Sequence, residues 1–151
     1  KFYNFKYAMK KIILLQICLF IAAFSQAQRF FYVAPGNIAE RLIKEDLLKA
    51  SQFVTRSPLM SDYSIHTEIS FKKETNTASL KIILKDSATF KTIYQTNEEY
   101  AFRTTRLDPQ ILLYMAMKTL IEEQIGRIIF WAKDDHLNSG MKNISLAPAK
   151  S

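Results

Sequence analysis

A strict alternation between apolar and polar side chains constrains the fold of this chain more than any other feature. Between Tyr63 and Phe71 the residues alternate, and after an interruption at residues 73–77 the alternation resumes from Leu80 to Leu84. Successive side chains of a β-strand point to opposite faces of a sheet, so a period of two requires one buried and one solvated face. The two segments therefore predict a β-hairpin with a single apolar side.

The position of the turn fixes the register of this hairpin. A tight turn at residues 75–76 keeps both apolar rows on one face and leaves the polar row in water. It predicts these cross-strand pairs: Phe71 with Leu80, Ile69 with Ile82, and His66 with Lys85.

Two further strands are predicted on either side of the hairpin. Residues 30–33 are aromatic or β-branched and end at Pro35-Gly36, which is typical of a buried strand followed by a turn. Residues 90–96 are rich in Thr, Ile and Tyr but alternate poorly, which indicates a strand at the edge of the sheet.

Helical periodicity marks two other segments. The first helix is expected after Asn37, whose side chain caps it while Glu40 reaches back to the cap, and its apolar stripe continues to Val54. The second helix begins after the cap residue Asp108, with Pro109 at the first helical position, where the missing amide costs nothing.

These elements predict an α+β domain of order β-α-β-β-β-α over residues 28–131. We expect a small, mostly antiparallel sheet with two helices packed on one face. Beyond Trp131 the periodicity is lost, so residues 132–151 are expected to form a flexible C-terminal tail.

The start of the chain has the three regions of a secretory signal peptide. Two lysines precede an almost wholly apolar run at residues 12–24, and small residues lead to a cleavage site between Ala27 and Gln28. The run is shorter than the about 20 residues that span a bilayer. We therefore expect a signal peptide at residues 1–27, a periplasmic or secreted protein, and no membrane span after cleavage.

The signal region also accounts for the cysteine and for much of the charge. Cys18 lies inside the apolar run, and not at its end as in a lipoprotein, so the mature chain is expected to lack lipid anchors, disulfides and thiolate chemistry. Four lysines precede the cleavage site, which leaves a scattered excess of basic residues that does not predict nucleic-acid binding. Residues 1–8 fit no part of the signal and are expected to lie upstream of a start at Met9.

A catalytic grouping can be drawn on the polar face of the hairpin. Ser64, His66 and Glu68 share this face, and Lys85 joins them from the second strand. Residues two apart are about 6.5 to 7 Å apart along a strand, whereas a Ser-His-acid triad needs hydrogen-bond contact and oxyanion donors. An open, flat face with a solvated histidine is the expectation; a small secreted hydrolase or a ligand-binding protein that uses this face is the alternative.

No other segment predicts a metal or a cofactor. Asp134-Asp135-His136 is an acid–histidine cluster, but three adjacent residues do not easily converge on one ion without a second cluster. Three glycines in the whole chain exclude a glycine-rich phosphate-binding loop. We therefore expect neither a metal site nor a cofactor.

The start of the second helix is unusually apolar. Residues 111–117 carry no charge, whereas a helix that covers one face of a sheet needs a single apolar stripe. Either residues 103–107 and the C-terminal tail cover the excess, or another protein does. In the second case Ile111, Leu112 and Met115 form a surface for dimerisation or for docking an envelope protein, with the edge strand beside it.

Short motifs give the chain a resemblance to known envelope domains. Asp62-Tyr63 opens the alternating strand, and a Leu-x-x-x-Leu-x-Asp-x-x-Thr pattern follows at Leu80, Leu84, Asp86 and Thr89. In these motifs and in the order of elements, residues 30–129 resemble small bacterial envelope domains of the TolB amino-terminal type and of the type of LpoB, a penicillin-binding-protein activator, and also short uncharacterised exported proteins. Those domains usually carry a glycine after the threonine, where this chain has Phe90.

The resemblance implies binding of a protein partner in the cell envelope. It implies no catalysis, and it transfers no set of functional residues. The sequence thus favours a non-enzymatic accessory or interaction domain of the envelope.

Overall fold

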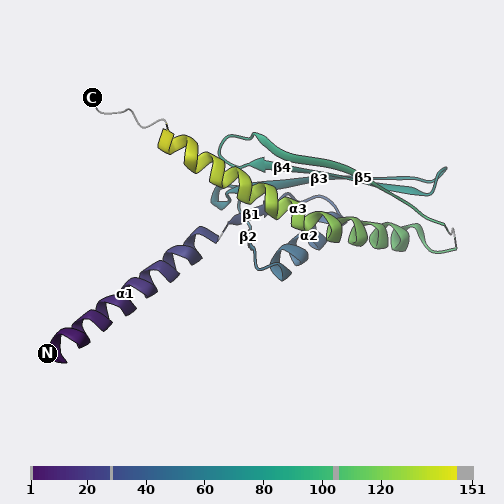
Figure 1. Cartoon of the computed structure of the whole chain (residues 1–151). Coiled ribbons are helices and arrows are strands. Elements are labelled where there is room, and N and C mark those ends of the chain that lie inside the picture. The colour runs from purple at the N-terminus through teal and green to yellow at the C-terminus, as the bar shows by residue number, and fades with distance from the viewer. Residues whose placement is uncertain (1, 28, 104–105, 146–151) are drawn as a thin grey trace.

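The computed structural model describes residues 2–27, 29–103 and 106–145, and shows a sheet with two helices on one face and a third helix that leads into it (Figure 1). The elements along the chain are α1 (Phe2–Ala27), β1 (Phe30–Val33), α2 (Ile38–Lys49), β2 (Phe53–Thr55), a 3-10 turn (Pro58–Met60), β3 (Tyr63–Lys72), β4 (Thr77–Asp86), β5 (Thr92–Ala101) and α3 (Pro109–Ser145). The predicted α+β class is confirmed.

The sheet has the strand order β2-β1-β3-β4-β5. β1 runs parallel to both of its neighbours, and β3, β4 and β5 are antiparallel to one another. β5 lies at the edge, as the poor alternation of residues 90–96 predicted, although the strand begins two residues later and continues to Ala101.

The strand β2 was not predicted from the sequence. Val54 was expected to continue the apolar stripe of the first helix, which was wrong, because α2 ends at Lys49 and Ser51 takes a left-handed backbone with a φ of 58°. The chain then extends, and residues 53–55 pair in parallel with residues 30–32. An aromatic and two β-branched residues in a row favour this strand.

The long hairpin of β3 and β4 confirms the one-sided burial but not the predicted register. Ile69 lies opposite Leu80, and His66 lies opposite Ile83, because the turn takes up residues 73–76 instead of two residues. The predicted pairs Phe71–Leu80, Ile69–Ile82 and His66–Lys85 were therefore wrong by two residues. A shift by two leaves every side chain on its predicted face.

The hydrophobic core lies between the sheet and the two covering helices. Its central residues are fully buried: Ile65, Leu80, Ile82 and Leu84 from the hairpin, Ile43 and Leu47 from α2, and Met117, Ile121 and Ile128 from α3. The apolar residues of the alternating strands and the apolar stripes of both helices therefore form one core layer. The opposite face of the sheet is not covered by a helix.

Side-chain caps start both covering helices. Asn37 caps α2 because its Oδ1 accepts a hydrogen bond from the Ala39 amide at 2.9 Å, while Glu40 accepts from the Gly36 amide, one residue before the cap. Asp108 caps α3 by accepting from the Gln110 amide at 2.7 Å. Both helix starts agree with the sequence prediction.

The helix α3 extends well beyond Trp131, where the predicted domain ends. Ala132 is fully buried, and Asp135 accepts a hydrogen bond from the Tyr63 hydroxyl at 3.1 Å. The predicted end of the helix was wrong. Beyond Trp131 the helix contacts the rest of the domain through the buried Ala132 and through the hydrogen bond to β3, and neither contact appears as an apolar stripe in the sequence. The flexibility of residues 132–151 stays a prediction, and residues 146–151 lie outside the described part.

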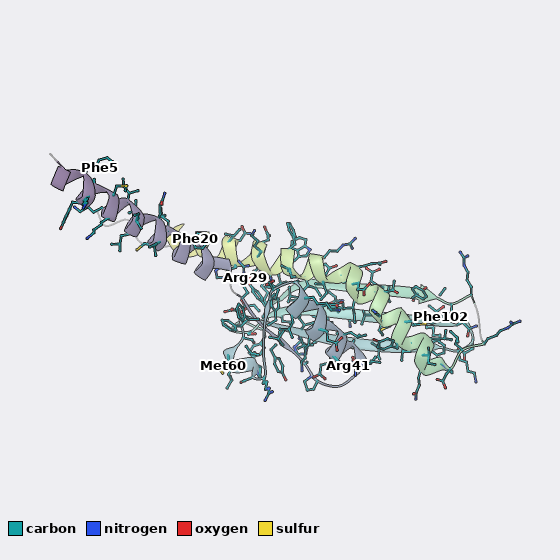
Figure 2. All side chains as sticks on the ribbon, turned by 90° about the horizontal axis from the view of Figure 1, so that it is seen from below. Phe5, Phe20, Arg29, Arg41, Met60 and Phe102 are labelled. Carbon is teal, nitrogen blue, oxygen red and sulfur yellow. The ribbon has the colours of Figure 1, made fainter. Side chains whose placement is uncertain are left out.

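The helix α1 stands away from the sheet. Its described side chains, residues 5–20, are all exposed, among them Phe5 and Phe20 (Figure 2). No helix in the described chain is both long enough and apolar enough to cross a membrane. The signal peptide predicted for this region stays a prediction.

Candidate binding site on the open face of the sheet

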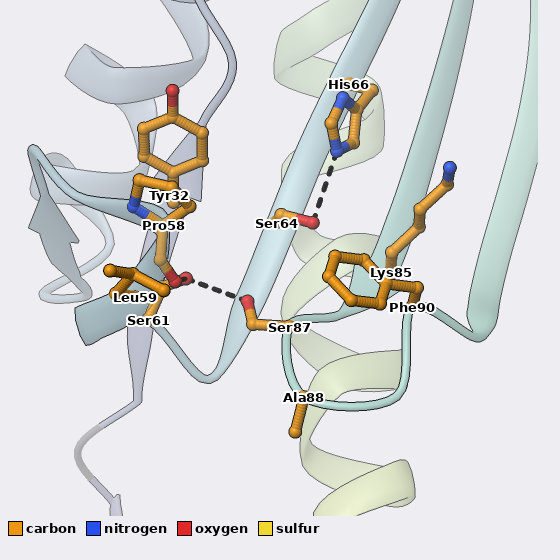
Figure 3. Close-up of a pocket in the computed structure, with 10 residues that line it drawn as sticks. All are labelled: Tyr32, Pro58, Leu59, Ser61, Ser64, His66, Lys85, Ser87, Ala88 and Phe90. Carbon is orange, nitrogen blue, oxygen red and sulfur yellow. Dashed lines mark hydrogen bonds between the residues drawn. The ribbon is translucent and has the colours of Figure 1, made fainter.

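The open face of the sheet is hollowed at one end, so the expectation of a flat face was wrong. A pocket of about 550 Å³ lies there, with Ser64 and His66 from β3 and Lys85 from β4 in its lining (Figure 3). Three of the four polar residues singled out from the sequence are thus brought together. Glu68, the fourth, does not line the pocket.

Two loops raise the walls of this pocket above the sheet. On one side stands the 3-10 turn with Pro58 and Leu59, and on the other stands the β4–β5 turn with Ser87 and Phe90 (Figure 3). The hydroxyls of Ser61 and Ser87 are 2.7 Å apart and join the two loops. The alternation of a strand says nothing about such loops, which is why the sequence did not predict the hollow.

The β4–β5 turn is held by the carboxylate of Asp86. Its Oδ1 accepts hydrogen bonds from the amides of Ala88 at 2.9 Å and Thr89 at 2.8 Å. The Asp86 carbonyl accepts from the Phe90 amide, also at 2.9 Å. The aspartate and threonine of the sequence motif therefore belong to the wall of the pocket.

Ser64 and His66 are in direct contact. The Nε2 atom of His66 is 3.2 Å from the Oγ atom of Ser64, although the spacing along a strand suggested separation. Side chains of a strand lean along its direction, and this closes the gap between two residues on the same face of β3 that are two positions apart. Ser64 is 7 % exposed, so this contact lies at the floor of the pocket.

No acid completes a catalytic triad here. Glu68 points to the other end of the open face, where the Lys81 Nζ lies 3.4 Å from its Oε2. No aspartate or glutamate lines the pocket among the described residues. The imidazole of His66 therefore lacks the carboxylate that would orient it as a general base.

The electrostatics of the pocket are set by one ammonium group. Burial, and then the nearby Lys85 ammonium, lower the pKa of His66 below its ordinary value, which favours the neutral imidazole. Within the described part of the chain, no carboxylate lies within ion-pair distance of Lys85. The pocket thus carries a positive charge that none of the described carboxylates pairs with.

The rim of the pocket is apolar and unusually exposed. Leu59 is 95 % and Phe90 is 76 % exposed. Phe90 also has a φ of 57°, in the left-handed region that a bulky residue rarely adopts. Phe90 stands where the resembling domains carry glycine, which is a signal in the sequence for an unusual backbone at this turn, but no rim was predicted from it.

The predicted surface on the second helix is only partly available. Ile111 and Met115 are 51 % and 52 % exposed, but Leu112 is 4 % exposed and packs inward. Leu112 is buried on α3 as Ala116 and Met117 are, although only the last two belong to the core cluster. Two of the three predicted residues therefore remain on the surface.

A smaller hollow of about 180 Å³ brings Asp135 and His136 close to Asp62 and Asp86. Burial, followed by the Asp135 carboxylate, raises the pKa of the Tyr63 hydroxyl that donates to Asp135. The described histidine, aspartate and glutamate residues, however, form no group that could hold a metal ion. Asp135 therefore has a packing contact that the sequence did not reveal.

Comparisons with known proteins show the fold and no more. No family model matches this chain, and no curated protein matches it by sequence. A Xanthomonas campestris protein of the family DUF330 matches with a TM-score of 0.53 at 13 % identity, over 73 % of this chain and 88 % of that one. A hypothetical protein from Chlamydia trachomatis matches with a TM-score of 0.50 at 16 % identity, over 70 % and 98 %.

A lipoprotein from Neisseria meningitidis is a more distant match. Its TM-score is 0.44 at 12 % identity, over 66 % of this chain and 96 % of that one. The two matches with a TM-score of 0.50 or above show a fold that is shared with bacterial proteins. The finer likeness to TolB or LpoB domains is not confirmed by these matches.

Proposed function

We propose that this chain is an exported accessory domain of the bacterial envelope that binds a partner molecule through the pocket on its open face and catalyses no reaction. The half-enclosed pocket at Ser64, His66 and Lys85 carries this proposal. Concave sites with apolar walls and a few convergent polar groups are the usual form of binding sites.

A hydrolase is the second candidate, favoured by the hydrogen bond between Ser64 and His66. Nucleophilic serine needs a base that a third group orients, and Glu68 is engaged with Lys81 instead. The proposal of binding without catalysis rests on this incomplete geometry. Covalent labelling of Ser64 by a fluorophosphonate, abolished by His66→Gln, would establish the hydrolase instead.

Export is supported by the start of the chain. Charged, apolar and cleavage regions follow one another up to Ala27, and the apolar side chains of α1 described over residues 5–20 are exposed. These three regions in this order are the pattern of a cleavable signal peptide. The resemblance to TolB and LpoB domains fits the same periplasmic setting.

A protein partner or a second copy of the chain belongs to this proposal through the exposed pair Ile111 and Met115. Met115→Lys is expected to abolish association in sedimentation velocity while leaving the unfolding curve unchanged. Thr119→Lys, an exposed position one turn further along α3, is the matched control. If both variants associate as strongly as the unchanged protein does, this surface is removed from the proposal.

Native mass spectrometry tests the pocket itself. The purified protein is incubated with an extract of envelope small molecules, and bound species are weighed. Ala88→Trp places an indole at the mouth of the pocket and is expected to abolish the adduct, whereas Ala101→Trp, at the exposed end of β5, is expected to retain it. An adduct that survives Ala88→Trp, or no adduct on any form, would contradict the proposal.

A further inference from the structure

The geometry points to the chemical class of the ligand: we infer that the pocket takes an organic anion, with a single anionic group beside Lys85 and an apolar body against the rim of Leu59 and Phe90. This inference rests on the proposed binding function and gives it a chemistry. Charge, hydrogen-bonding capacity and shape each support it independently.

Two lysines on the same face of β4 differ in whether a carboxylate pairs with them. Lys81 lies 3.4 Å from the Glu68 carboxylate, so its charge is already paired. Lys85, four residues further on, lines the pocket and has no carboxylate partner among the described residues. A partly enclosed ammonium without a counter-charge favours an anion, since an ion pair is stronger where water is partly excluded.

Ser64 and His66 share one hydrogen bond and keep a further donor. If the Ser64 hydroxyl donates to Nε2 of a neutral His66, the imidazole keeps its proton on Nδ1. If Nε2 donates to Ser64, the serine hydroxyl keeps its own proton free. In either arrangement this pair retains one donor for the ligand, next to the Lys85 ammonium.

The two other serines of the pocket do not compete for this role. Ser61 donates its proton to the Pro58 carbonyl at 2.8 Å. The hydrogen bond between the Ser61 and Ser87 hydroxyls therefore takes its proton from Ser87. Lys85, Ser64 and His66 therefore supply donors for an anion on the sheet, and the Tyr32 hydroxyl is a further donor in the lining.

The apolar part of the ligand is indicated by the two walls of the pocket. Tyr32 and Leu59 line one wall and Phe90 lies on the other, beside Lys85, and both Leu59 and Phe90 are largely exposed in the protein alone (Figure 3). A volume of about 550 Å³ lies within the range of pockets that hold small organic ligands. An inorganic anion would leave both exposed side chains in water, so the anion must carry an apolar body.

Calorimetric titration with three probes tests this inference on the purified protein. Octanoate combines a carboxylate with an apolar chain, octanol has the chain without the charge, and acetate has the charge without the chain. Octanoate is expected to bind about tenfold more tightly than octanol, as one charge-assisted contact requires. Acetate is expected to give no measurable binding.

Substitutions on β4 assign the charge. Lys85→Met is expected to reduce the affinity for octanoate to that for octanol, while Lys81→Met, the matched control on the same face, leaves both affinities unchanged. Ala88→Trp is expected to abolish the binding of both probes. Equal affinities of octanoate and octanol, or equal losses from the two lysine substitutions, would overturn the inference.

The failure of this inference can be told apart from failure of the binding function. If envelope adducts disappear with Ala88→Trp but persist with Lys85→Met, the pocket binds and its ligand is not held by this ammonium. If Ala88→Trp changes neither the adducts nor octanoate binding, the pocket is not the binding site and both ideas fall.

Discussion

The two faces of the β3–β4 hairpin have the same backbone but very different surroundings. On the covered face Ile82 and Leu84 of β4 are fully buried, whereas Ile69 of β3 is only partly buried. On the open face Ser64 is nearly buried, whereas Glu68 is exposed. The helices α2 and α3 therefore bury most of one face, and two short loops enclose only one end of the other.

The difference teaches where a binding site can arise in so small a domain. The covered face is filled by side chains from α2 and α3, and no ligand can enter it without loss of the core. The pocket on the open face can change shape with little loss of stability, since its walls are the 3-10 turn and the β4–β5 turn and not part of the core. Specificity can thus be built on loops over a rigid sheet.

The largest expected effect comes from adjacent residues of β4 that point to opposite faces. Ile82→Ala should lower the free energy of unfolding by about 3 kcal/mol, because Ile82 is fully buried. Ile83→Ala, on the open face and only partly buried, should cost no more than about 1 kcal/mol. Urea unfolding monitored by circular dichroism measures both. Equal losses would break the contrast between the faces.

The contact of β3 with the far part of α3 is expected to have the next largest effect. Tyr63→Phe removes the hydrogen bond to Asp135 and should cost about 2 kcal/mol near neutral pH. Thr119→Ala, at an exposed position of the same helix, is the control and should be close to neutral.

The same tyrosine predicts an alkaline loss of stability. Because the folded pKa of Tyr63 is raised, the unfolded chain releases the phenolic proton first as the pH rises above about 10. Stability is therefore retained below that pH and falls above it, and Tyr63→Phe should flatten the fall. Identical alkaline curves for both proteins would show that residues near Asp135 do not dock on the sheet.

The covered face could be predicted from the sequence because burial there follows a period. Alternation placed Ile65 and Ile82 on one side, and the caps Asn37 and Asp108 gave both helix starts. The register was wrong by two residues because a four-residue turn and a two-residue turn keep the same faces. Periodicity alone does not distinguish them.

The pocket could not be predicted because it depends on loop positions. The serine and histidine were recognised as neighbours on one face, but their contact depends on how the two side chains lean along β3. The walls that enclose them come from the loops at residues 58–61 and 87–90. β2 was missed for a related reason, since Val54 fits a helical stripe and a short strand equally well. Tertiary context decided between the two.

At the enclosed end of the open face, His66 predicts a further loss of stability in acid. Burial, and then Lys85, lower the folded pKa of His66, so the unfolded chain binds the proton first as the pH falls below about 6.5. Stability is therefore retained above that pH and falls below it. His66→Gln should reduce this fall between pH 7 and about 5, and His136→Gln, at an exposed position, should not. If His66→Gln leaves the fall of stability in acid unchanged, the side chain of His66 is solvated as in the unfolded chain.

The smallest expected effect concerns the strained rim. Phe90→Gly should raise the free energy of unfolding by about 0.5 to 1 kcal/mol, because glycine adopts the left-handed backbone without strain but loses more entropy on folding. Asn76→Gly should gain less, since asparagine tolerates its φ of 47°. The same Phe90→Gly protein should bind octanoate more weakly. A gain in stability with unchanged binding would remove Phe90 from the site.

The most direct test of the account is a map of octanoate binding on the open face, followed by the amide chemical shifts of the purified protein. The account predicts saturable shifts at Ser64, His66 and Lys85, at the enclosed end, and none at Glu68 and Lys81, at the exposed end of the same two strands. Shifts spread equally over both ends, or confined to α3 around Met115, would contradict it.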